Sequence, residues 1–151
     1  MDDSVTASAR WNRHRAREAA LQILYYWEVG RVDLAQATAT YWANQEDEPP
    51  PGRLRAFASD LARTTVEQLA RIDELITAAA EHWRLSRMAV IDRLILRLAA
   101  AELLAGGDTP PGVIIDEALE LAKTFSADDS VKFINGVLDG VRRRLEAEGG
   151  R

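Results

Sequence analysis

Apolar side chains recur along most of the chain at the spacing of an α-helix. Between about Asn12 and Val29 they stand at i, i+4, i+7, i+8 and i+11, at Ala16, Ala20, Ile23, Leu24 and Trp27. This spacing gathers them on one helix face. The pattern therefore predicts a first helix that ends near Gly30, a residue type favoured just past a helix C-terminus.

The middle of the chain predicts two further helices separated by a loop. Asp33 is a candidate N-cap for a helix that runs to about Gln45. Residues 46–52, EDEPPPG, cannot continue a helix because they combine three acids, three prolines and a glycine. A long apolar pattern then runs from Leu54 to about Ala80, and we expect a bend or break near Asp73.

The last third predicts three helices. Ser86 is a candidate cap for a helix from about Met88 to Ala105, whose apolar residues cover more than one stripe and place it at the centre of the fold. The next helix starts near Pro110 and ends near Phe125. Ser126 is a candidate cap for the last one, with an inner face of Phe133, Ile134, Val137, Leu138, Val141 and Leu145. No segment alternates as a strand does, so the expected fold is all-α, with six or seven helices.

Composition narrows the class of protein. The chain has 151 residues, no cysteine and 47% hydrophobic residues, which suits one compact domain without disulfides or thiol ligands. The N-terminus lacks the apolar core of a signal peptide, and residues 88–104 are too charged to span a membrane. We expect a cytoplasmic protein with no membrane partner.

Catalytic and metal-binding motifs are not found in the sequence. The two histidines, His14 and His82, stand far apart, and no phosphate-loop, nucleophile-elbow or zinc-protease pattern occurs. Pairs of acids such as Glu117/Glu120 have the spacing of solvated helix faces. We therefore expect no enzyme activity, no cofactor and no metal site.

Charge is distributed unevenly along the chain. Residues 10–17, RWNRHRAR, carry four arginines and no acid, so within a net charge of −5 the other 143 residues sum to −9. On a helix Arg10, Arg13, His14 and Arg17 form one stripe and Arg15 points elsewhere. Cations at a helix N-terminus oppose the helix dipole, which favours an external anionic partner. Charge alone leaves two interpretations open: a site for RNA or another polyanion, and a solvated basic helix start.

Four blocks of sequence resemble the NusB family of bacterial transcription antitermination factors, in the family's order. They are RHRAREAALQILYYWE (13–28), DRLILRLAAAELL (92–104), VIIDEALELAKTF (113–125) and DDSVKFINGVLDGV (128–141). The resemblance implies about seven helices in two packed helical subdomains. It places a tail at residues 1–9 and one domain at residues 10–147, with halves of about 10–82 and 83–147.

The resemblance also implies a function. Family members pair with the ribosomal small-subunit protein NusE, bind the single-stranded boxA element of ribosomal RNA leaders, and join RNA polymerase with other Nus factors. By this resemblance the RNA-binding residues are Arg13, His14, Arg15, Arg17, Asp129, Lys132 and Phe133, and the charge pattern adds Arg10. The partner-binding residues are Tyr25 and Asp92. For Phe133 a core position, and for Asp92 a solvated helix start, are the alternative interpretations.

Some positions depart from the family pattern. Pro111-Gly112 stand where Tyr-Lys is frequent, Asp116 stands for an asparagine, and Ala101 stands for an aromatic residue. These changes predict RNA binding that is weaker or that depends more on the first helix. Two other interpretations stay open: a homodimeric helical interaction module without an RNA role of its own, and an accessory domain of an rRNA methyltransferase.

Overall fold

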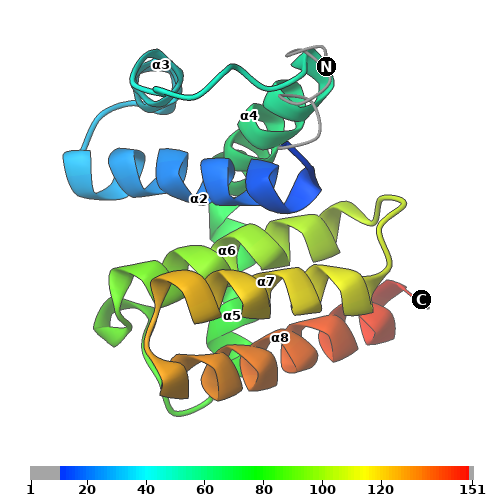
Figure 1. Cartoon of the computed structure of the whole chain (residues 1–151). Helices are drawn as coiled ribbons and strands as arrows, with labels where there is room; N and C mark the ends of the chain where they lie inside the picture. The colour runs from blue at the N-terminus through cyan, green and yellow to red at the C-terminus, as the bar shows by residue number, and fades with distance from the viewer. Residues whose placement is uncertain (1–10, 150–151) are drawn as a thin grey trace. The chain divides into compact units, whose positions relative to one another are not determined.

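The computed structural model describes residues 11–149, which form two compact helical units (Figure 1). The first unit ends at Val66 and the second begins at Glu67. Within residues 11–149 there are seven α-helices, one short 3-10 helix and no strand. The expected all-α class is confirmed. Arg10 and the expected tail at residues 1–9 lie outside the described residues.

The first unit contains α2 (Arg13–Gly30), α3 (Leu34–Ala43) and α4 (Gly52–Glu67). The Asn12 side chain caps α2 by accepting a hydrogen bond from the Arg15 backbone N–H at 2.9 Å. The Asp33 side chain caps α3 in the same way, with the Gln36 N–H at 2.8 Å. The predicted cap at Asp33 is confirmed, and each cap satisfies a backbone donor that a helix start leaves without an internal partner.

The long apolar pattern of residues 54–80 forms two helices, and the break differs from the predicted one. It lies at Gln68, between α4 and α5 (Leu69–Ala79), and not near Asp73. Asp73 is inside α5, where its carboxylate accepts hydrogen bonds from Arg97. Because α5 packs on the later helices α6 and α8, it belongs to the second unit. The observed boundary therefore comes about one helix earlier than the expected one near residue 82.

The second unit also contains the 3-10 helix η1 (Leu85–Arg87), α6 (Val90–Ala105), α7 (Pro111–Phe125) and α8 (Asp128–Gly149). Helix α6 packs against α5, α7 and α8, and ten of its sixteen residues are buried, which confirms its predicted central position (Figure 1). The apolar residues on more than one of its faces explain this position, since each face meets another helix.

Two predicted caps are wrong. Ser86 lies in η1 and is exposed, and α6 begins only after it, at Val90. Ser126 does not cap α8, because its hydroxyl donates to the carboxylate of Asp92 instead. A serine hydroxyl near a helix start has competing partners, and a buried carboxylate is the stronger acceptor.

Helices α5 and α8 approach each other closely at a glycine. A Cβ atom added at Gly140 would lie 3.0 Å from the Cβ of Ala79. Two small residues therefore meet where the helices touch, and a larger side chain at either position would push the helices apart. Among the described residues, no helix combines the length and the apolar character needed to cross a bilayer.

Candidate functional site

The start of α2 holds two arginines against one aromatic ring. The guanidinium carbon of Arg13 lies 4.9 Å from the ring centroid of Phe57 in α4, and that of Arg17 lies 5.3 Å from it. Positions 13 and 17 are about one helical turn apart, so the helix brings both cations to the same ring. Arg13 is exposed, whereas Arg17 is only 4% exposed. Arg13 therefore presents its charge to solvent, whereas Arg17 is packed inside the first unit against the Phe57 ring.

Arg15 points to a different partner, as the helical spacing predicts. Its Nη2 lies 2.8 Å from Oδ2 of Asp47 in the acidic loop, the segment Glu46–Glu48 that follows α3. Its guanidinium also stacks over the indole of Trp11, 4.1 Å from the ring centroid. The acidic loop thus folds against the arginine-rich helix start.

The side chain of Trp11 anchors the acidic loop by a hydrogen bond to the backbone of the loop. Its indole N–H donates to the backbone carbonyl of Glu48 at 3.2 Å, and its ring contacts Trp42 at 6.0 Å between centroids. At 5% exposure Trp11 is a core residue and is not available to stack on a nucleobase.

Two further polar side chains of the first unit, His14 and Tyr41, have defined neighbours. The Nε2 of His14 lies 3.0 Å from a carboxylate oxygen of Glu18, about one turn along α2. Tyr41 packs between Tyr26 and Trp42. Burial raises the pKa of its phenol above the ordinary value of 10.0, an effect that the nearby Arg15 partly opposes. Tyr41 is therefore neutral at physiological pH.

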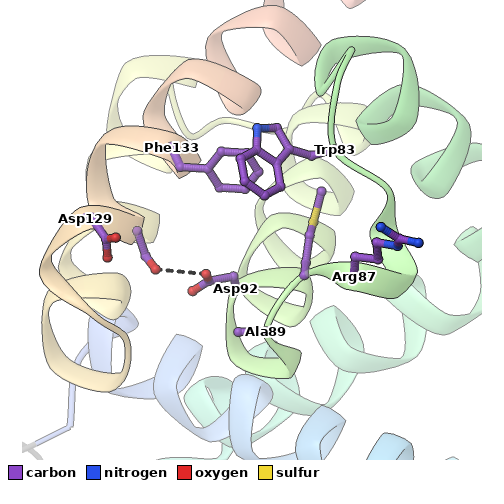
Figure 2. A pocket seen from close by; sticks show the side chains of 8 residues that line it. Trp83, Arg87, Ala89, Asp92, Asp129 and Phe133 are labelled. Atoms are coloured by element: carbon purple, nitrogen blue, oxygen red, sulfur yellow. Dashed lines mark hydrogen bonds between the residues drawn. The ribbon is translucent and has the colours of Figure 1, made fainter.

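The second unit contains a pocket of about 300 Å³ near the start of α8 (Figure 2). Trp83, which follows α5, and Phe133 of α8 meet edge to face, with ring centroids 5.6 Å apart and planes at 70°. Trp83 is exposed and Phe133 is half-buried, so Phe133 lines a pocket wall and is not sealed in the core. Arg87 and Asp129 add one charge of each sign to the lining.

Asp92 lines the same pocket and is held by internal hydrogen bonds. The hydroxyls of Ser126 and Ser130 each donate to one of its carboxylate oxygens, the latter at 2.8 Å. Asp92 is 8% exposed, so its interpretation as a solvated acid at a helix start is wrong. Its role in partner binding stays a prediction, and the structure shows that it ties α6 to the start of α8.

The remaining predicted residues lie at the surface. Tyr25 is exposed near the end of α2, close in sequence to exposed Tyr26 and Val29. Asp129 and Lys132 are exposed in the first two turns of α8. An asparagine within a helix is often a buried hydrogen-bonding group, but Asn135 of α8 is exposed.

Sequence reasoning missed three residues that shape these sites: Phe57, Asp47 and Trp83. Phe57 fitted the apolar stripe of its helix and gave no separate signal. Asp47 stood in a loop whose partner is 32 residues away. Trp83 offered a signal, since a tryptophan between two helices is a large aromatic without a place in either apolar stripe. Within residues 11–149, no group of three or more acidic or histidine side chains is arranged to hold a metal ion.

The fold and these sites define an all-helical protein of two small units with an arginine-rich start to its first described helix. The NusB family model matches residues 14–143. The chain therefore belongs to the NusB family, as the sequence resemblance indicated, and this is a family of transcription antitermination proteins.

Relatives and solved structures agree over most of the chain. The transcription antitermination protein NusB of Solibacter usitatus is 50% identical over 89% of this chain and 90% of its own length. That of Koribacter versatilis is 45% identical, over 90% and 92%. A structure of NusB from T. maritima superposes with a TM-score of 0.80 at 38% identity, over 88% of this chain and 92% of that one.

A further similar structure contains a complex. It is a crystal structure of antitermination factors NusB and NusE with dsRNA, which matches with a TM-score of 0.77 at 25% identity, over 89% of this chain and 99% of that chain. In that assembly a chain of the same fold is found together with both a protein partner and an RNA.

Proposed function

We propose that the chain is a cytoplasmic transcription antitermination factor that acts by binding, without covalent chemistry. It binds the single-stranded boxA element of ribosomal RNA leader transcripts together with NusE. The pair then joins the RNA polymerase elongation complex with other Nus factors. The observation that carries this proposal is the arginine edge, which we define as Arg13, Arg15 and Arg17 at the start of α2.

The arginine edge has the chemistry of a phosphate-binding surface. Arg13 is exposed, and both Arg13 and Arg17 lie over Phe57, which restricts their guanidinium groups before any ligand arrives. A guanidinium binds phosphate through two parallel N–H donors, and a restricted side chain loses less entropy on binding. The body of the protein is acidic, which disfavours indiscriminate coating by RNA and suits a basic ribosomal partner.

The other proposed contacts lie on separate elements. Lys132, Asp129 and the half-buried Phe133 offer a cation, an acceptor and an aromatic edge to RNA at the start of α8. Exposed Tyr25 provides an aromatic contact for NusE. Asp92 is buried and accepts hydrogen bonds from two serines, and we assign it to the NusE interface as a residue that fixes the start of α8.

Alanine substitution at all three positions of the arginine edge tests the proposal. We expect R13A/R15A/R17A to bind fluorescein-labelled single-stranded boxA RNA at least about tenfold more weakly, in the presence and absence of NusE. The slope of log affinity against log salt should become shallower by about 1.4, since Arg13 and Arg15 each lose a phosphate contact and each contact accounts for about 0.7 of the slope. Fluorescence anisotropy measures both quantities.

The matched control is R142A/R143A/R144A, which removes three arginines from α8. It changes net charge equally, so a similar loss would assign the effect to charge in general. Because Arg17 is packed, the single variant R13A provides a second measurement that does not disturb the core. Unchanged affinity and salt slope in both R13A and the triple variant would overturn the proposal.

A further inference from the structure

We propose that Asp47 is an internal counter-ion of the RNA site that occupies Arg15 in the free protein and yields it to an RNA phosphate. Asp47 thereby makes the arginine edge favour RNA that is also held by other contacts over a loosely held polyanion. This inference rests on the proposed function, because it assumes that Arg15 contacts RNA.

The ion pair between Arg15 and Asp47 is suited to exchange. Its atoms are 2.8 Å apart, yet the side chains are 27% and 68% exposed. A pair as hydrated as this has a small net stability, so a ligand that offers a better arrangement of acceptors displaces it readily. A phosphate group offers several oxygens and matches the two parallel donors of a guanidinium.

The backbone beside Asp47 is anchored, although its side chain is in solvent. The buried indole of Trp11 donates to the carbonyl of Glu48, the next residue. Prolines 49–51 follow, and the carbonyl of Pro51 accepts hydrogen bonds from two backbone N–H groups near the start of α4, those of Leu54 and Arg55. Three consecutive prolines also restrict the backbone of this segment. The carboxylate therefore stays near Arg15 after it is displaced, and a change of rotamer is sufficient to release it.

Selectivity follows from this arrangement. Every anion that binds Arg15 must replace a carboxylate that remains close by, at high effective concentration. A phosphate positioned by other contacts of the RNA, such as those of Arg13, replaces it. A loosely held polyanion does not gain enough from Arg15 to do so. Removal of the Asp47 charge should therefore strengthen RNA binding.

The test compares D47N with D139N in the full chain. Asp139 also forms an exposed pair with an arginine, Arg143 of α8, so both variants lose one acid from a comparable pair. We expect D47N to bind labelled single-stranded boxA RNA about two- to fivefold more tightly at low salt, and D139N to change by less than about twofold. The advantage of D47N should shrink at about 0.3 M salt, where exposed charges are screened.

The same substitution in an R15A background shows whether Arg15 carries the effect. We expect D47N to add no more to R15A than D139N does. The inference is overturned if D47N binds no more tightly than D139N, or if its advantage persists in R15A.

The two proposals fail in different ways. If R13A/R15A/R17A binds RNA as the unmodified protein does, the proposed function loses its site. If the triple variant binds weakly and D47N is without effect, only the role of Asp47 is refuted.

Discussion

Two arginine–aspartate pairs, one in each unit, have the same shortest distance and different surroundings. Arg97 of α6 meets Asp73 of α5 through two hydrogen bonds, of 2.8 and 3.0 Å, and these side chains are 10% and 28% exposed. Arg15 meets Asp47 at 2.8 Å, and these side chains are 27% and 68% exposed, each more than its counterpart in the first pair. Judged by distance alone, the two pairs would be expected to contribute equally to stability.

Burial separates their roles. A buried guanidinium that loses its carboxylate keeps a charge that water no longer solvates, so the inner pair, Arg97 with Asp73, is costly to break. Water replaces either partner of the outer pair, Arg15 with Asp47, at little cost. The inner pair therefore holds α5 to α6, whereas the outer pair is able to exchange its partner.

The largest effect expected is that of Asp73→Ala. We expect its free energy of unfolding to fall by about 3 kcal/mol, near the lower end for a buried pair because Asp73 is partly exposed. Urea denaturation measures this, with Asp139→Ala as a control that breaks an exposed pair and should cost less than about 0.5 kcal/mol. Equal losses in the two variants would show that burial does not separate these pairs.

A smaller loss is expected for Asp92→Ala, which tests whether the pocket is built on an internal network. Removing the carboxylate deprives Ser126 and Ser130 of a charged acceptor, and we expect a loss of about 2 kcal/mol in unfolding free energy. Asp116→Ala, at an exposed position of α7, should stay within about 0.5 kcal/mol in the same urea measurement. If Asp92→Ala were as stable as that control, the hydrogen bonds of Asp92 would not contribute measurably to the stability of the fold.

The smallest expected effect is that of D47N on stability. We expect a change of less than about 0.5 kcal/mol in urea denaturation, because the outer pair is hydrated on both sides. A loss of about 2 kcal/mol or more would mean that the acidic loop is part of the scaffold, and it would contradict the comparison of the two pairs.

The sequence predicted what local patterns determine. The cap at Asp33 and the buried centre of α6 follow from residue type and spacing. Helix α2 ends at Gly30, as predicted, but the left-handed residue just past it is Arg31 and not the glycine. The break at Gln68 was missed because neither glycine nor proline stands there. Local signals predict helix caps and apolar stripes well. They do not show where one continuous apolar pattern divides into two packed helices.

The sites show the same limit more strongly. Helical spacing of the arginines is sufficient to place Arg13 and Arg17 on one stripe. Asp92 was open to interpretation as a surface group because its two serine donors are 34 and 38 residues away. Asp47 lay in a loop with no periodic pattern. Contacts over such separations arise from tertiary packing, which single-sequence patterns do not encode.

The close approach of α8 to α5 at Gly140 has a consequence for the aromatic pocket. Gly140 and Phe133 are seven residues apart, nearly two full turns, so they project in almost the same direction from α8. With no side chain at Gly140, the α8 backbone comes close to Ala79 on this side of the helix. On the same side of α8, Phe133 contacts Trp83, which follows α5 in the chain. One side of α8 therefore makes both contacts with the α5 region: the close backbone approach at Gly140 and, about two turns away, the ring contact of Phe133 with Trp83 (Figure 2).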